Sequence, residues 1–388
     1  MSGQTIYADN AASTRLSAAA KAAMLPCFDL VYANPSAPHA MGRAAAAALT
    51  DARAQIAAAL GCDPAELYFN SGGTEADAQA LRTAAILGAQ SGKRHIISTA
   101  FEHHAVLRTL DLLGQEGFEI ELLAVPENGV VTAPQVAAAI RPDTCLVSVM
   151  FANNEIGTLQ PVAEIGAVCR AAGVLFHTDA AQAAGQTPID VRTQQIDLLS
   201  LSAHKFHGPK GVGALYARKG LCPVPLLAGG GQERGARPGT ENLPGIVGMA
   251  AALAEATACL NETAAALTER RDRLIAGLSE IPQAVLNGDA ERRLPGNVNF
   301  SFAGIEGEAL LLLLDARGIC ASAGAACTAG APEPSHVLLA IGRSPALARG
   351  ALRLTLSADV TDAEIEAILR AVRETVALLR AAPGRNNQ

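Results

Sequence analysis

The stretch that decides the fold runs from Val174 to Lys205 and reads VLFHTDAAQAAGQTPIDVRTQQIDLLSLSAHK. It contains two short apolar runs, Val174–His177 and Leu198–Leu201, and polar residues follow each run. Short apolar runs that alternate with alanine-rich helical stretches are typical of a parallel sheet covered by helices. Ligands bind beyond the carboxyl ends of the strands in such sheets, so the polar residues after each run are candidate site residues.

The same alternation extends over residues 15–255 and predicts a large α/β domain with a mainly parallel sheet covered by helices. The other strand candidates are Leu67–Phe69, His95–Ser98, Cys145–Val149 and Val212–Tyr216. Each of these runs is short enough for a strand, and most are followed by polar or glycine-rich residues. The predicted site therefore assembles from segments that are distant in the sequence.

The alternation of strand-like and helical segments stops at a long charged and apolar helix. We expect this helix at Leu253–Leu278 and interpret it as the domain connector. Residues 1–14 and 256–388 are predicted to form a smaller α+β domain that carries a cysteine loop. Its expected elements are a strand at Asn297–Phe302, a helix at Glu306–Arg317, a small-residue loop at Ala321–Ala331, a helix at Ser335–Ile341, a strand at Ala351–Ser357 and a helix at Asp362–Leu379.

The composition excludes several function classes. The formal net charge is -7 and no Lys/Arg-rich run occurs, so a nucleic-acid partner is not expected. The longest apolar runs are far shorter than a membrane span, and the N-terminus lacks a signal-peptide pattern, so we expect a cytoplasmic protein without membrane contact. Cysteine and histidine do not fall at metal-ligand spacing, and no metal site is expected.

Two charged residues follow the apolar runs of the quoted stretch. Lys205 stands before a glycine-rich turn in SAHKFHGPKG. A lysine in a partly desolvated pocket can form a Schiff base with an aldehyde cofactor, although a lone lysine is more often a surface residue. The carboxylate of Asp179 suits a pyridinium nitrogen and, equally, the N-cap of a helix. The pair together favours a cofactor that acts as an electron sink.

Two further clusters follow predicted strands. Ser71–Glu75 reads SGGTE and opens an alanine-rich helix, so the N–H groups of Gly73 and Thr74 can bind a phosphate. A capping turn explains Thr74 about equally well. His103 comes just past the strand at His95–Ser98, where it can stack on a ring and carry a proton or serve as a core or capping residue.

An amide-rich segment and a small-residue segment complete the candidates. Asn153–Gly157 reads NNEIG and offers the Asn154 amide to a phenolic oxygen, while paired asparagines also form turns. Cys327 lies in ASAGAACTAG, and small residues favour the access that a reactive thiol requires. Cys320 stands just before this run and is interpreted as a packed residue.

These residues lie in strings that closely resemble the bacterial cysteine desulfurases, in the class V aminotransferase group of fold-type I pyridoxal-phosphate enzymes. The matching strings are YADNAAST, YANPSAPH, NSGGTEA, FEHHAVL, ANNEIG, HTDAAQ, SAHKFHGPKG, GGGQERGARPGTEN and ACTAG followed by EPSH. They occur in the right order over almost the whole chain. The resemblance implies pyridoxal 5'-phosphate as the cofactor, L-cysteine as the substrate, and a homodimer that passes sulfur to an acceptor protein.

The resemblance also implies a role for each matched residue around the cofactor ring. Lys205 binds the cofactor covalently, Asp179 pairs with the ring nitrogen, and His103 stacks on the ring and shuttles protons. Asn154 and Gln182 bind the phenolic oxygen. The residues implied for the phosphate are Gly73, Thr74, Ser202, His204 and, from the neighbouring subunit, Thr240.

For the substrate, the resemblance implies that Arg353 clamps the carboxylate, together with Asn154, and that Cys327 attacks the sulfur to leave alanine and a persulfide. A transamination or a β-elimination without a persulfide would use the same fold and cofactor, but the cysteine loop argues against it. A non-catalytic scaffold is disfavoured because the chain retains four residues together, namely Lys205, Asp179, His103 and Cys327. The acceptor's pathway, whether iron–sulfur assembly, nitrogenase, tRNA thiolation or molybdenum cofactor, stays open.

Overall fold

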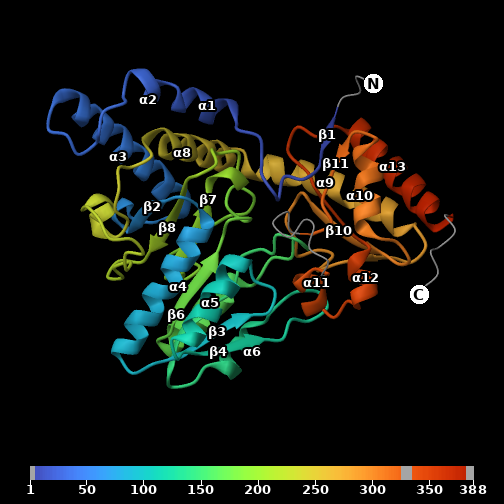
Figure 1. Ribbon diagram of the computed structural model, residues 1–388, viewed down its shortest axis with the longest axis horizontal. Coiled ribbons are helices and arrows are strands. Elements are labelled where there is room, and N and C mark those ends of the chain that lie inside the picture. Colours follow the sequence, from blue (N-terminus) through green and yellow to red (C-terminus); the bar gives the residue numbers. More distant parts are fainter. Residues whose placement is uncertain (1–4, 325–333, 382–388) are drawn as a thin grey trace.

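The computed structural model describes residues 5–324 and 334–381 of the 388-residue chain. A seven-stranded sheet with helices on both faces forms one part, and a three-stranded sheet covered by helices forms the other (Figure 1). The predicted combination of a mainly parallel α/β unit with a smaller α+β unit is therefore confirmed.

The large sheet has the strand order β2-β8-β7-β6-β5-β3-β4. Its strands are β2 Leu67–Asn70, β3 His95–Thr99, β4 Glu119–Leu123, β5 Thr144–Ser148, β6 Leu175–Asp179, β7 Leu198–Ser202 and β8 Gly213–Ala217. Only β8 runs against its neighbours, pairing antiparallel with β2 and β7. All six predicted strands are present within one or two residues. The edge strand β4 was not predicted.

Both faces of the sheet are buried, which explains the nearly continuous apolar runs. Val147 of β5 enters one core while its neighbour Leu146 enters the other, as the alternation of side chains along a strand requires. Helices α4 and α5 pack on one face, and helices α3, α6, α7 and α8 pack on the other. These helices are α3 Ala40–Leu60, α4 Gly73–Gln90, α5 His104–Gln115, α6 Ala133–Ala139, α7 Val162–Ala172 and α8 Leu243–Ala258.

The smaller unit is built on an antiparallel sheet of order β12-β10-β9. Its elements are α9 Leu260–Ser279, β9 Ala284–Leu286, β10 Asn297–Phe302, α10 Gly307–Asp315, α11 His336–Ala340, α12 Pro345–Arg349, β12 Ala351–Thr355 and α13 Asp362–Ala381. Side chains of α9, α10 and α13 form one core with β10 and β12. The N-terminal strand β1 Ile6–Tyr7 pairs in parallel with β11 Ile319–Cys320, so the start of the chain joins this unit.

The connector differs from the prediction of one helix over Leu253–Leu278. Helix α8 ends at Ala258, α9 begins at Leu260, and the two axes meet at 71°. In the described part of the chain no single helix is long and apolar enough to cross a membrane; only α8 and α9 taken together reach that length and composition. The division into residues 15–255 and the remainder stays a prediction.

Near its N-terminus the chain forms two short helices, α1 Ala18–Met24 and α2 Pro26–Asp29, which lie against α8 (Figure 1). Their sequence is rich in alanine and apolar residues, yet several large side chains stay exposed. Phe28, Leu30 and Tyr32 are 62%, 68% and 66% exposed. They lie at alternate positions in and just after α2, so exposed apolar side chains are concentrated in this short segment.

Candidate active site

One cavity of about 330 Å³ lies beyond the carboxyl ends of β6 and β7, between the large sheet and the smaller unit. This volume falls in the range typical of small-molecule sites. The residues that line it are Ala11, Ala12, Gly73, Thr74, Asp77, His103, Met150, Asn154, Asp179, Ala181, Gln182, Ser202, His204, Lys205 and Arg353. The structure thus brings together all the predicted site residues except Cys327 and Thr240.

Lys205 lies on a short 3-10 turn directly after β7. Its Nζ donates to the carbonyl oxygens of Ala11 at 2.5 Å and Ala12 at 3.0 Å. These carbonyls belong to the N-terminal segment (residues 6–14), which forms a wall of the cavity opposite the strand ends. The amine is therefore held inside the cavity by groups nearly two hundred residues away in the sequence.

Asp179 is the last residue of β6 and is buried. Its Oδ1 accepts a hydrogen bond from the Ala181 N–H at 2.9 Å in a turn, and no helix starts there, so the N-cap alternative is wrong. Burial raises the pKa of the Asp179 carboxyl, while the nearby His103 and Lys205 lower it. A protonated ring nitrogen beside this carboxylate would add a further stabilising charge. Gln182 lies next to it and donates to the Ala11 carbonyl at 3.0 Å.

His103 caps helix α5 and also lines the cavity. Its Nδ1 accepts the Ala105 N–H at 3.1 Å, so the neutral ring carries its proton on Nε2. Burial lowers the pKa of the His103 imidazole, Asp179 opposes this, and Lys205 adds to it. His103 therefore caps α5 and lines the cavity, and its role toward a cofactor ring stays a prediction.

The N-terminus of α4 points its unpaired N–H groups toward the cavity side that Gly73 and Thr74 line. Gly72 holds this turn at a φ of 150°, which favours glycine, and makes no side-chain capping bond. Thr74 is thus not the cap, and its hydroxyl is available for a ligand. Ser202 adds a second hydroxyl on this side of the cavity. A Cβ added to Gly73 would lie 3.4 Å from the Ser202 Cβ, so the two residues are direct neighbours.

His204 also borders this side of the cavity. Its Nδ1 lies 3.3 Å from the Ser13 hydroxyl, so the N-terminal segment contacts the ring. Burial, with smaller contributions from Lys205 and Lys210, lowers the pKa of the His204 imidazole to about 4. The ring is therefore neutral at pH 7 and can donate one hydrogen bond to an anion without adding charge.

Arg353 reaches the cavity from the middle of β12 and is 1% exposed. One terminal nitrogen pairs with Asp9 Oδ1 at 2.7 Å, and the other donates to the Asn154 carbonyl at 3.1 Å. Its Nε has no hydrogen-bond partner among the described residues. The guanidinium is thus fixed on two sides and keeps donors for an incoming carboxylate.

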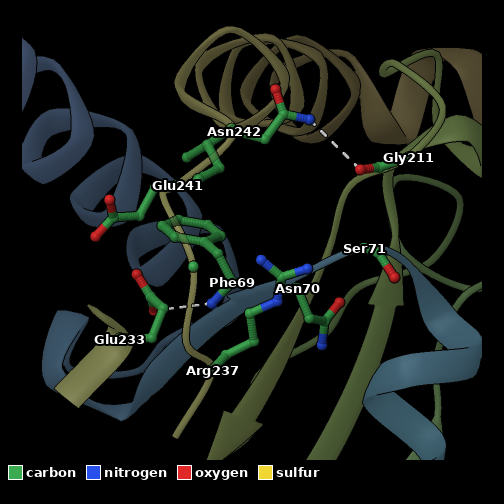
Figure 2. Close-up of a pocket in the computed structure, with 10 residues that line it drawn as sticks. Phe69, Asn70, Ser71, Gly211, Glu233, Arg237, Glu241 and Asn242 are labelled. Atoms are coloured by element: carbon green, nitrogen blue, oxygen red, sulfur yellow. Dashed lines mark hydrogen bonds between the residues drawn. The ribbon is translucent and has the colours of Figure 1, made fainter. Parts of the chain in front are cut away.

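Two of the predicted residues remain to be considered. Cys327 lies outside the described residues. Thr240 is exposed and does not line the cavity in a single chain. It follows Gly239 of a second, smaller pocket of about 40 Å³, where Figure 2 shows Arg237 between Phe69 and Asn70.

The loop that carries Thr240 is tied to the start of α4. Arg237 pairs with Glu75 at 3.0 Å, and the same Glu75 carboxylate accepts the Ser71 N–H. Four residues before Arg237, the buried Glu233 adopts a φ of 46°. Its carboxylate accepts a hydrogen bond from the Phe69 N–H (Figure 2). These contacts fix the loop that leads to the exposed Thr240.

Sequence reasoning missed several lining residues. Asp77 is 1% exposed and lies one helical turn after Gly73, a spacing that places it on the same face of α4. Burial, followed by repulsion from Asp179, raises the pKa of the Asp77 carboxyl well above its usual range. The Ala11 and Ala12 carbonyls carry no side-chain signal, although they belong to the YADNAAST string.

These groups fit pyridoxal phosphate. A helix N-terminus with two hydroxyls suits a phosphate, a buried carboxylate suits a ring nitrogen, and a lysine amine suits an aldehyde. Within residues 5–324 and 334–381, no cluster of three or more histidine, cysteine or acidic side chains is placed to hold a metal ion. The cavity therefore suits an organic phosphate cofactor.

Comparisons with known proteins agree with this geometry. The aminotransferase class-V family profile matches residues 6–368. A cysteine desulfurase, IscS, from Methanosarcina thermophila is 48% identical over 97% of this chain and 93% of its own length. A cysteine desulfurase from Nostoc sp. is 45% identical over 99% of this chain and 96% of its own.

Solved structures give the same result. A NifS-like protein superposes with a TM-score of 0.91 at 38% identity, covering 97% of this chain and all of its own. The structure of SspA in complex with cysteine superposes with a TM-score of 0.81 at 38% identity, over 91% of this chain and 99% of its own. The chain therefore belongs to the aminotransferase class-V family, among its pyridoxal-phosphate-dependent cysteine desulfurases.

Proposed function

We propose that this chain converts L-cysteine to L-alanine, holds the sulfur as a persulfide on Cys327 and passes it to an acceptor protein. The observation that carries the proposal is the single cavity in which Lys205, Asp179, His103 and Arg353 meet. Relatives named as cysteine desulfurases over nearly the full length support the reaction, and SspA, at 38% identity, was solved with cysteine bound.

The large sheet supplies the residues that hold the cofactor. Lys205 is positioned to bind its aldehyde carbon, and Asp179 to pair with its ring nitrogen. Gln182 and Asn154 lie at the cavity for the phenolic oxygen. The residues proposed to bind the phosphate are Gly73, Thr74, Ser202 and His204 of the same chain. Thr240 of the partner subunit is proposed to join them. When bound, pyridoxal phosphate supplies an electron sink that weakens the bonds around the substrate α-carbon.

His103 is proposed to stack on the ring and to carry protons. Because burial lowers its pKa below the ordinary value of about 6.5, the imidazole is neutral at pH 7 and can accept a proton. In the neutral ring Nδ1 accepts the Ala105 N–H and Nε2 carries the proton, so the ring takes up a further proton only when the bond from the Ala105 N–H is released. The Lys205 amine, once released from the aldehyde, is a second group that can move a proton at the α-carbon.

Arg353 is proposed to bind the substrate carboxylate. Its buried guanidinium borders the cavity beside Asn154 and offers parallel N–H donors, which match a carboxylate. This contact would fix the position of the amino acid relative to Lys205.

Cys327 is proposed as the sulfur acceptor within the enzyme. Its thiolate forms an S–S bond with the substrate sulfur while the substrate Cβ–S bond breaks. The electron pair of the broken bond stays with the carbon, which takes up a proton and leaves as alanine. No external oxidant is required, because the sulfur is carried away in the persulfide. The acceptor protein then takes the outer sulfur through one of its own nucleophiles.

A homodimer is proposed because the phosphate site calls for Thr240 from a neighbouring copy. Thr240 is exposed and does not line the cavity of its own chain, so it is accessible to a second copy. The apolar surface at Phe28, Leu30 and Tyr32 is suited to burial between two copies. A cytoplasmic location is supported by the thiols, since all seven cysteines within the described ranges are unpaired.

The test is Cys327→Ala, with Cys320→Ala as the matched control. The Cys327→Ala variant should keep the cofactor absorbance and its change on adding L-cysteine, yet form neither persulfide nor sulfide, because no nucleophile takes the sulfur. Cys320→Ala should remain active. Steady turnover of L-cysteine by Cys327→Ala, with no added sulfur on the Cys327 peptide of the parent enzyme by mass spectrometry, would contradict the proposal and indicate elimination.

A further inference from the structure

Asp9 does not line the cavity, yet it contacts the residue that reaches into it. Its Oδ1 lies 2.7 Å from a terminal nitrogen of Arg353, and the Asp9 side chain is 18% exposed. The other terminal nitrogen of Arg353 donates to the Asn154 carbonyl at 3.1 Å. Two of the three guanidinium nitrogens are therefore held by the protein itself, and only Nε has no partner among the described residues.

Asp9 is itself fixed by the backbone. It forms a parallel bridge with Thr355, and the Thr355 N–H donates to the Ala8 carbonyl at 2.7 Å. The Ala11 N–H donates to the Thr355 hydroxyl at 2.9 Å. Because Thr355 stands two residues after Arg353 on β12, these bonds set the distance between the Asp9 carboxylate and the guanidinium.

The pair explains how a cation can lie buried in the cavity before a substrate arrives. Arg353 is 1% exposed, and a buried guanidinium without a counter-charge is unfavourable. A fixed guanidinium also loses little side-chain entropy when a carboxylate binds, whereas a mobile arginine loses more. Asp9 therefore supports binding by preorganisation, although its charge weakens the attraction of Arg353 for a second carboxylate.

We propose that Asp9 is a positioning residue that orients Arg353 for the substrate carboxylate. The proposal rests on the proposed function, in which Arg353 binds that carboxylate. Preorganisation outweighs competition because Asp9 occupies one N–H of a terminal nitrogen, while Nε and the second hydrogens of both terminal nitrogens remain. The two effects have opposite signs, so a substitution at Asp9 distinguishes them.

The experiment compares the holoenzyme with its Asp9→Ala and Asp9→Asn variants. Asp111→Ala is the matched control, because it removes an exposed carboxylate paired with Arg108 on α5. Steady-state kinetics with L-cysteine give KM and kcat. Absorbance titrations of the bound cofactor give the affinity for L-cysteine and for cysteamine, which has the same amine and thiol but no carboxylate.

Asp9→Ala should raise the KM for L-cysteine about tenfold while kcat stays within about threefold, since a lost binding contact acts on KM. Asp9→Asn keeps an acceptor and should show a smaller rise. Cysteamine affinity should be the same in all variants. An unchanged or lower KM in Asp9→Ala, or an equal loss of cysteamine affinity, would overturn the proposal.

The absorbance titration separates this inference from the proposed function. If the parent holoenzyme binds L-cysteine more tightly than cysteamine but forms no persulfide, the desulfurase proposal fails while the role of Asp9 is still measured. If the parent forms the persulfide and Asp9→Asn and Asp9→Ala keep its full preference for L-cysteine over cysteamine, only the role of Asp9 fails. The cofactor absorbance of each variant shows that the cavity has formed.

Discussion

The cavity has two walls that are built in different ways. The sheet wall consists of His103, Asp179, Ser202 and Lys205, which stand at or just past the ends of strands of the large sheet. The strap wall consists of Ala11 and Ala12 of the N-terminal segment and of Arg353, which is in the middle of β12 and is held by Asp9 from outside the cavity. Each residue of the sheet wall is positioned by the strand that precedes it in the sequence. The strap wall instead depends on contacts between segments 344 residues apart.

The difference in construction matches the difference in proposed task. Strand ends in a buried parallel sheet are rigid, and they suit a cofactor that stays bound through every turnover. The strap wall depends on contacts between the start and the end of the chain, and it contains Arg353, the residue proposed to bind the substrate. We therefore expect substitutions in the sheet wall to affect the cofactor, and substitutions in the strap wall to affect substrate affinity alone.

The largest effect is expected for Lys205→Ala in the sheet wall. Loss of the amine removes the covalent bond to the cofactor, and turnover of L-cysteine should fall by at least about a thousandfold. Borohydride reduction of the parent followed by peptide mapping should place the pyridoxyl label on Lys205. The exposed Lys210 provides the control variant, Lys210→Ala, and a label on Lys210 or Lys219 would refute the assignment.

A smaller effect is expected for Arg353→Lys in the strap wall. Lysine keeps the charge but cannot contact Asp9, Asn154 and a carboxylate at once, so the KM for L-cysteine should rise about a hundredfold. The cofactor absorbance and its retention on dialysis should match the parent, because no sheet-wall group is changed. Loss of the cofactor in this variant would show that the two walls are not independent.

The same contrast explains how much the sequence could predict. Each sheet-wall residue lies at or just past the end of an apolar run, and those runs appear as strands within one or two residues of their predicted positions. The motif resemblance alone singled out Arg353, since an arginine in a strand looks like any exposed position. Asp9 and Ala11 lie in the YADNAAST string, but the sequence alone assigned them no role, because their partners Arg353 and Lys205 are 344 and 194 residues away.

Other misses have local physical reasons. Strand β4 reads EIELL, and its position at the sheet edge leaves charged side chains exposed, so no continuous apolar run marks it. The break at Cys259 between α8 and α9 contains neither glycine nor proline. Helical periodicity continues on both sides of the break, and only the packing of each helix on a different core separates them.

The smallest effect is expected at Glu102, which precedes His103 and is fully buried behind the sheet wall. Its Oε1 accepts hydrogen bonds from the Thr99 hydroxyl at 2.6 Å and the Met150 N–H at 3.0 Å, and Oε2 has no partner among the described residues. Burial raises the pKa of this carboxyl to about 8. The side chain is therefore an uncharged acid at neutral pH.

The sign of its effect on stability follows from proton binding. Between about pH 4.5 and 8 the folded protein holds a proton on Glu102 that the unfolded chain releases, so this group makes the free energy of unfolding fall as pH rises. Glu102→Gln keeps both acceptor contacts and cannot ionise. Its melting temperature should equal the parent's near pH 5 and exceed it by a few degrees near pH 9. Glu308→Gln, at an exposed position, serves as the control. If the melting temperatures of the parent and of Glu102→Gln depended on pH in the same way, the buried carboxyl would ionise without a cost in stability.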